Sequence, residues 1–63
     1  MENAPERRRQ MRASDADRDR VIETLGNALA DGRLTVEEHA ERLDAVSAAK
    51  TLGELEVITQ DLP

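Results

Sequence analysis

Residues 25–43 read LGNALADGRLTVEEHAERL, and this stretch contains a helix end, a turn and a helix start in close succession. Gly32 follows an apolar run of helical period, and glycine adopts the left-handed conformation after a helix without steric cost. Thr35 is followed three residues later by Glu38, which is the spacing of a capping box. The stretch therefore predicts two helices, joined by a link of about three residues, that lie antiparallel or cross steeply.

Two similar signals mark the starts of further helices. Ser14 precedes Asp17, and Thr51 precedes Glu54, each at the spacing of a capping box. The predicted fold class is all-α, with a two-helix hairpin over about 15–31 and 36–50 and a short third helix over about 52–61. The inner face of the second helix is expected to consist of Val36, Ala40, Leu43, Val46 and Ala49.

Gly26 interrupts the apolar stripe of the first predicted helix, at a cost of about 1 kcal/mol relative to alanine. Either the glycine permits a close crossing of another helix, or it lies exposed on the surface. The sequence leaves both interpretations open.

Length and composition restrict the classes of protein to consider. The chain has 63 residues, no Cys and no aromatic residue, so it forms one small domain without disulfides or cysteine-based metal sites. No apolar run approaches the roughly 18 residues of a membrane span, and we expect the chain as given to be soluble.

Charge divides the chain into two parts. Residues 1–13 contain four Arg and two Glu, a balance of 4 − 2 = +2, whereas residues 14–63 contain 5 basic and 12 acidic side chains, or −7. Because residues 1–13 also lack a regular apolar pattern, they are predicted to be a disordered basic arm that precedes a domain over 14–63. Arg7, Arg8 and Arg9 are either a contact for nucleic acid or anionic lipid, or a solvated leader.

Residues that could carry out catalysis are few. His39 is the only histidine, and no nucleophile or further metal ligand accompanies it in the sequence. It is expected at the edge of the apolar stripe. We predict no catalytic residue, no cofactor and no metal site, and hence a protein that is not an enzyme.

The runs MRASDADRDRVIETL, ADGRLTVEEHAERLDAV, AAKTLGEL and DLP resemble the SHOCT-like domain of unknown function that is common near the N-termini of actinobacterial proteins. The resemblance covers residues 11–63. Lys50 and Leu52 depart from the pattern, which more often has arginines on both sides of the threonine. The resemblance implies no enzymatic activity and a cytoplasmic domain that often precedes a transmembrane segment, at the cytoplasmic face of the membrane.

The function we predict is a small helical module for protein interaction or oligomerisation, with a weak homo-oligomer or another protein as the partner. Leu52 and Val57 are candidate contacts, because they cannot both face inward together with Leu55 and Ile58. Arg18, Arg33 and Arg42 are further candidates, although pairs with nearby acids, within their own helices for Arg18 and Arg42, are the favoured explanation.

The alternative function is a helix-turn-helix DNA-binding module that uses the arginine-rich arm. The helix after the turn carries Glu37, Glu38, Glu41 and Asp44. Because these carboxylates would repel phosphates, nucleic acid is not the expected partner, and a membrane contact would require the basic arm or another segment.

Overall fold

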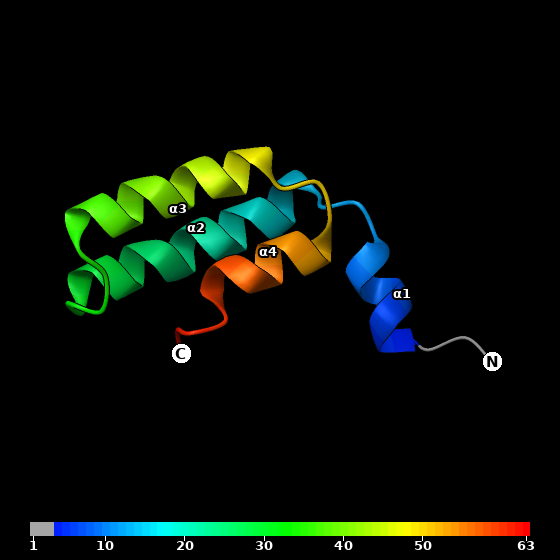
Figure 1. Ribbon diagram of the computed structural model, residues 1–63, viewed down its shortest axis with the longest axis horizontal. Helices are drawn as coiled ribbons and strands as arrows, with labels where there is room; N and C mark the ends of the chain where they lie inside the picture. The colour runs from blue at the N-terminus through cyan, green and yellow to red at the C-terminus, as the bar shows by residue number, and fades with distance from the viewer. Residues whose placement is uncertain (1–3) are drawn as a thin grey trace.

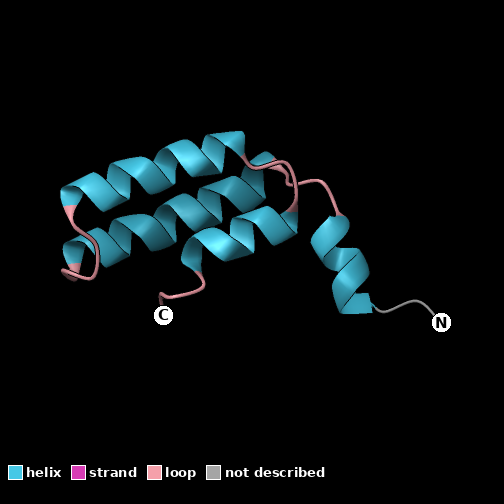
Figure 2. Cartoon of the chain, viewed as in Figure 1, coloured by secondary structure: helices cyan, strands magenta, loops and turns pink. Residues whose placement is uncertain are grey.

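The computed structural model describes residues 4–63, which form four helices (Figures 1 and 2): α1 (Ala4–Gln10), α2 (Asp15–Ala30), α3 (Val36–Ala48) and α4 (Leu52–Thr59). Helices α2 and α3 form an antiparallel hairpin, and α4 packs against both of them. Helix α1 projects from one end and contacts α4. The predicted all-α class, the hairpin and the short third helix of the domain are confirmed.

The corner between α2 and α3 follows the predicted signals. Gly32 has a φ angle of 77°, in the left-handed region. The N–H of Arg33 donates to the carbonyl of Ala28 at 2.8 Å, and the N–H of Gly32 donates to that of Leu29 at 3.1 Å. These two bonds form a Schellman motif, which satisfies carbonyls at the end of α2. Helix α2 therefore ends where glycine allows the chain to reverse.

Two of the three predicted capping boxes are complete, at Ser14 with Asp17 and at Thr35 with Glu38. The third differs from the prediction. The Thr51 hydroxyl accepts from the N–H of Glu54, but the Glu54 carboxylate accepts from the N–H of Lys50 at 2.8 Å. The reciprocal bond is shifted by one residue, and Thr51 instead forms an isolated antiparallel bridge with Arg12.

The core lies between α2, α3 and α4 and contains six buried residues: Leu25, Ala28, Leu34, Val46, Ala49 and Leu55. The predicted inner face of α3 is wrong at its first turn, because Val36 is 69% exposed and Ala40 is also exposed. Leu34, which precedes the cap of α3, is buried at that end of the domain instead. Gly26 lies exposed, and a Cβ there would meet nothing within 4 Å, so it is not at a close helix crossing.

The prediction of a disordered arm over 1–13 is wrong for the part of the arm that the structure describes; residues 1–3 lie outside it. Residues 4–10 form α1, and residues 11–13 run beside the start of α4. The N–H of Ala13 donates to the carbonyl of Lys50, and the N–H of Leu52 donates to that of Met11, both at 2.9 Å. The composition of the arm gives no reason for order, because its bonding partners lie between 37 residues (Ala13 to Lys50) and 41 residues (Met11 to Leu52) away in the sequence.

Helix α1 approaches α4 closely at Gly53. A Cβ added at Gly53 would lie 3.1 Å from the carbonyl oxygen of Arg9, so only glycine leaves full room for the α1 backbone there. The Arg9 guanidinium also pairs with the Glu56 carboxylate at 3.7 Å. These contacts hold α1 against the first turns of α4.

Candidate functional site

Arg18 is engaged within the fold. Its guanidinium donates to the carbonyl of Ala49 at 2.8 Å and to that of Ala13 at 3.2 Å, and it pairs with Asp15 at 3.7 Å. Ala49 is the C-cap of α3, so Arg18 ties the beginning of α2 to the end of α3. The pair with Asp15 is the intrahelical contact that the sequence allowed, but the bond to Ala49 is the one that joins distant parts of the chain.

Arg42 forms a bidentate contact with Asp61. Its Nη1 and Nη2 donate to the two carboxylate oxygens at 2.7 and 2.9 Å, and Nη1 also donates to the carbonyl of Ile58 at 3.0 Å. The hydrogen bonds from Arg42 lower the pKa of Asp61, and the same contact raises the pKa of Arg42. The direct partner of Arg42 is therefore Asp61 rather than Glu38 of its own helix, and the contact fastens the end of α4 to α3.

Arg33 lies in the corner and is exposed; its side chain makes no recorded hydrogen bond or ion pair with residues 4–63. It borders a small hollow of about 60 Å³ together with Leu62 and Pro63. The structure thus places Arg18, Arg33 and Arg42 in three separate parts of the molecule. They do not form one surface.

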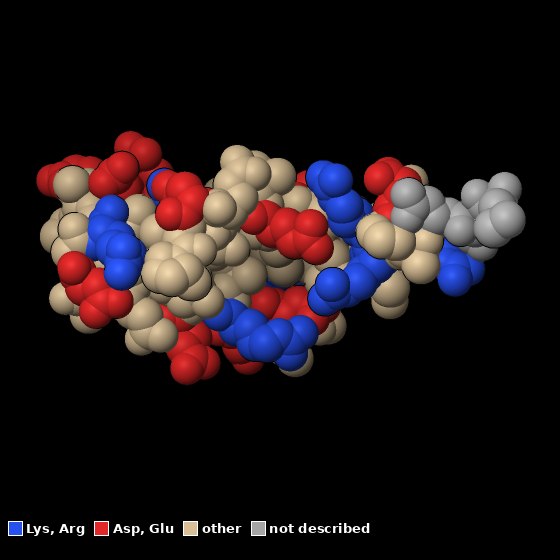
Figure 3. Space-filling view, turned by 90° about the horizontal axis from the view of Figure 1, so that it is seen from below, with Lys and Arg blue, Asp and Glu red and all other residues tan. Residues whose placement is uncertain are grey.

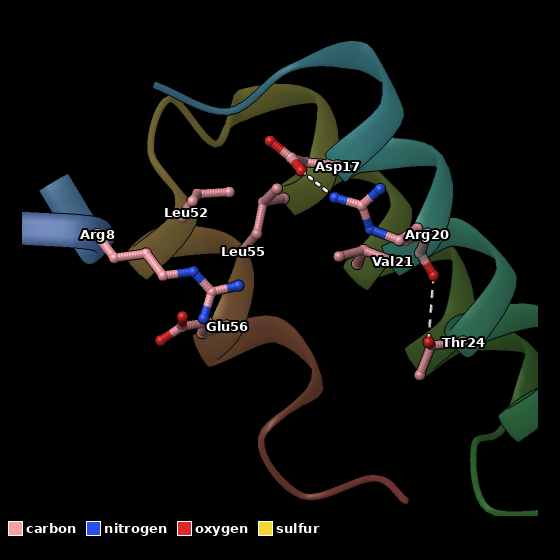
Figure 4. Close-up of a pocket in the computed structure, with 8 residues that line it drawn as sticks. All are labelled: Arg8, Asp17, Arg20, Val21, Thr24, Leu52, Leu55 and Glu56. Atoms are coloured by element: carbon pink, nitrogen blue, oxygen red, sulfur yellow. Dashed lines mark hydrogen bonds and ion pairs between the residues drawn. The ribbon is translucent and has the colours of Figure 1, made fainter. Parts of the chain in front are cut away.

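Leu52 and Val57 also lie apart. Leu52 is half-buried and lines a cleft of about 160 Å³ between α1, α2 and α4 (Figure 4). The lining of this cleft combines apolar and charged side chains: Arg8, Asp17, Arg20, Val21, Thr24, Leu52, Leu55 and Glu56. Both acids of the cleft already have basic partners, Arg20 for Asp17 and Arg9 for Glu56.

Val57 lies in a second hollow, which we name the α3–α4 groove. It is an open groove of about 370 Å³, lined by Glu41, Arg42, Ala45, Val57, Ile58, Gln60 and Asp61. Val57 is 53% exposed there and gives the groove an apolar centre together with Ala45. The sequence pointed to Val57 because it did not fit the apolar stripe, but it gave no signal that Glu41 and Ala45 of α3 would form the opposite wall.

The candidate anion contacts Arg7, Arg8 and Arg9 are exposed on α1. Arg8 borders the cleft of Figure 4, and Arg9 pairs with Glu56. Figure 3 shows that, on the face it presents, most basic side chains gather toward the end that carries α1, whereas acidic ones are spread over the remainder.

The titratable groups with shifted pKa values are capping and pairing groups. The hydrogen bond from the Ser14 backbone, and then that from its hydroxyl, lowers the pKa of Asp17, and Thr35 lowers the pKa of Glu38 in the same way. A general acid at neutral pH needs a raised carboxyl pKa, which is the opposite shift. Within residues 4–63 no group of three or more His, Asp or Glu side chains could hold a metal ion, and His39 is half-buried.

The length and hydropathy of the helices can be compared with those of a membrane-spanning helix. None of the helices in the described part of the chain is both long and apolar enough to cross a bilayer.

Comparison with known proteins identifies the family. A family model described as the DUF1707 SHOCT-like domain matches residues 11–63, so the match begins after α1. Two uncharacterized proteins of Mycobacterium tuberculosis, one from strain CDC 1551 / Oshkosh and one from strain ATCC 25618 / H37Rv, are each 47% identical over 51 residues. The aligned part is 81% of this chain but 18% of each relative. No solved structure matches, and on the evidence of the family model the chain belongs to the DUF1707 SHOCT-like domain family.

Proposed function

We propose that this protein is a non-enzymatic helical module for protein interaction, and that it binds a partner in the α3–α4 groove. The observation that carries the proposal is the exposed side chain of Val57 beside Ala45, in a groove between two ordered helices. A groove between helices with an apolar centre and polar edges suits an amphipathic helix of a partner. The partner is a second copy or another protein.

The rigidity of the groove supports this proposal. Arg42 donates to the end of α4 from α3, so both walls are held at a fixed spacing before a partner arrives. A preformed surface loses less conformational entropy on binding than a mobile one does. The polar edges, Glu41 and Gln60, offer hydrogen bonds around the apolar centre.

The acidic surface of α3 weighs against the DNA-binding alternative. Glu37, Glu41 and Asp44 are exposed on this helix, which follows the turn and would have to approach phosphates. We further propose that the module acts in the cytoplasm, as the head of a membrane-linked protein where the domain is part of a longer chain. The support is that this chain spans 18% of each mycobacterial relative, together with the family resemblance.

Site-specific photo-crosslinking in the native host tests the groove. A benzophenone amino acid replaces Val57 in one variant and Val36 in a matched control, because Val36 is a still more exposed valine on α3 that does not line the groove. We expect a defined adduct from position 57 and none from position 36, with mass spectrometry identifying the adduct as this chain or another protein. The proposal fails if both positions give the same adducts or if neither gives one.

A further inference from the structure

One end of the molecule carries exposed basic side chains around an exposed apolar one. Met11 is 56% exposed, and Arg12 and Lys50 are exposed on the two segments that the Arg12–Thr51 bridge joins. Neither the Arg12 nor the Lys50 side chain makes a recorded hydrogen bond or ion pair with residues 4–63. The Lys50 backbone donates to the Glu54 carboxylate at 2.8 Å, so the local charge here is +2 − 1 = +1. We call Met11, Arg12 and Lys50 the basic end.

The α3–α4 groove has the opposite charge. Glu41 and Asp61 line it, and Glu38 lies close enough to interact electrostatically with Asp61 and Arg42. Three carboxylates and one guanidinium give a local charge of −3 + 1 = −2. Arg42 is bound to Asp61. Glu41 has no basic partner recorded among the described residues.

From this complementarity we infer that the partner in the groove is the basic end of a second copy of this chain, in a head-to-tail arrangement. This inference rests on the proposed function. The flexible Met11 side chain contacts Val57 and Ala45, while Arg12 and Lys50 face the carboxylates at the edge. Each copy then offers a basic end to one neighbour and a groove to another.

The overall charge of −5 does not prevent this contact. In the contact, Arg12 and Lys50 lie against the carboxylates of the neighbouring groove, and the Debye length at physiological ionic strength is about 8 Å, so the charges at the contact outweigh the more distant ones. A head-to-tail contact extends into an open chain unless its rotation closes a ring. It produces chains whose mean mass grows with concentration and falls with added salt.

Complementary variants provide the test, because a head-to-tail contact needs only one intact surface from each copy. The groove variant is Glu41→Lys with Val57→Lys, and the basic-end variant is Arg12→Gln with Lys50→Gln, so that the two altered surfaces do not attract each other in the mixture. The matched control is Glu23→Lys with Ile22→Lys, which places the same charges on an exposed part of α2. Sedimentation equilibrium at about 50 mM and about 500 mM NaCl reports the masses.

We expect the wild-type protein and the control to form open-ended chains at low salt. Each variant alone should self-associate with an affinity at least about tenfold lower than that of the wild-type protein. An equimolar mixture of the two variants should form one-to-one dimers that grow no further. A mixture that stays monomeric, or one variant that dimerises alone, overturns the inference.

Circular dichroism establishes that each variant is folded. If the groove variant is unfolded, Glu41→Gln with Val57→Gln replaces it, with a smaller effect in the same direction. If the basic-end variant is unfolded, Arg12→Ala with Lys50→Ala replaces it in the same way. If the mixture fails while position 57 cross-links to a different protein, the proposed function stands and only the head-to-tail inference falls. If position 57 captures nothing, the proposed function falls as well.

Discussion

The α2–α3 hairpin and the attachment of α4 are stabilised in different ways. In the hairpin, the turn uses only local signals, since Gly32, Thr35 and Glu38 lie within seven residues and bond to near neighbours. Helix α4 is attached by contacts over long sequence distances, such as Arg42 to Asp61 across 19 residues and Arg12 to Thr51 across the whole hairpin. The first kind of contact specifies where helices begin and end, and the second specifies how they are assembled.

This difference teaches that α4 depends on a few polar contacts at its two ends. Its middle is anchored by Leu55, which is 3% exposed in the shared core. Its first turn meets residues 11–13 and α1, and its last turn meets Arg42. Local opening of α4 therefore requires fewer interactions to break than opening of the hairpin.

The largest expected effect comes from Arg42→Gln, which removes the contact at the end of α4. Loss of hydrogen bonds to a charged group costs about 1.5–3 kcal/mol, or on the order of 10 °C in Tm for a domain of this size. Hydrogen exchange should accelerate more in α4 than in α2 or α3. Arg33→Gln is the matched control, because the Arg33 side chain has no recorded polar contact with residues 4–63, and it should change stability by less than about 0.5 kcal/mol.

Equal acceleration of exchange in all three helices after Arg42→Gln would contradict the comparison. It would mean that α4 and the hairpin open as one cooperative unit, so that the distinction between local and long-range contacts has no consequence for stability.

Two glycines of the hairpin should respond to alanine in opposite directions. Gly32→Ala places a Cβ at a φ of 77° and should destabilise the domain by about 1–2 kcal/mol. Gly26→Ala adds a methyl group at an open position within α2 and should stabilise it by about 0.5–1 kcal/mol. Urea unfolding of both variants measures the two values, and a gain in stability for Gly32→Ala would show that the corner does not depend on left-handed backbone.

Acid should weaken the attachment of α4 through Asp61. The Arg42 contact lowers the pKa of this carboxyl below its ordinary value of 3.8, so at acidic pH the unfolded chain binds more protons than the folded one. The stability that Asp61 contributes is complete above its ordinary pKa and disappears as the pH falls through the lowered value. Asp17 and Glu38 act in the same direction.

Thermal unfolding between pH 7 and pH 2.5 measures this dependence. Asp61→Asn should reduce the fall in Tm at acidic pH, and it should have no such effect when Arg42→Gln is already present, since the two residues act as one pair. An unchanged acid response in Asp61→Asn alone would remove Asp61 from the explanation.

The sequence predicted α2, α3 and α4 well because each of these helices begins or ends at residues whose capping partners are close in the sequence. The corner at Gly32 and the caps at Ser14 and Thr35 needed no knowledge of distant parts of the chain. Helix α1 was missed because its order depends on Gly53 and Glu56, which lie on another helix. The exposure of Val36 was missed because Leu34, outside the helical period, is the residue buried at that end.

Candidate site residues were predictable in part, for the same reason. The exposure of Val57 could be found because Val57 breaks the apolar period of its helix, which is a local signal; its contact with a partner stays a prediction. The uses of Arg18 and Arg42 could not be found, because their principal acceptors are Ala49 and Asp61, 31 and 19 residues away. The sequence offered acids of the same helix as their partners, whereas the fold joins both arginines to distant parts of the chain.

The bridge between residues 11–13 and 50–52 also has a mechanical consequence. A pull on the amino-terminal side of the domain passes through two hydrogen bonds directly to the start of α4, bypassing the 37 residues of chain from Ala13 to Ala49. Where this domain connects a moving segment to a fixed one, the contacts of α1 with α4 and then those two bonds bear the load, and α2 and α3 remain unstretched until both have broken.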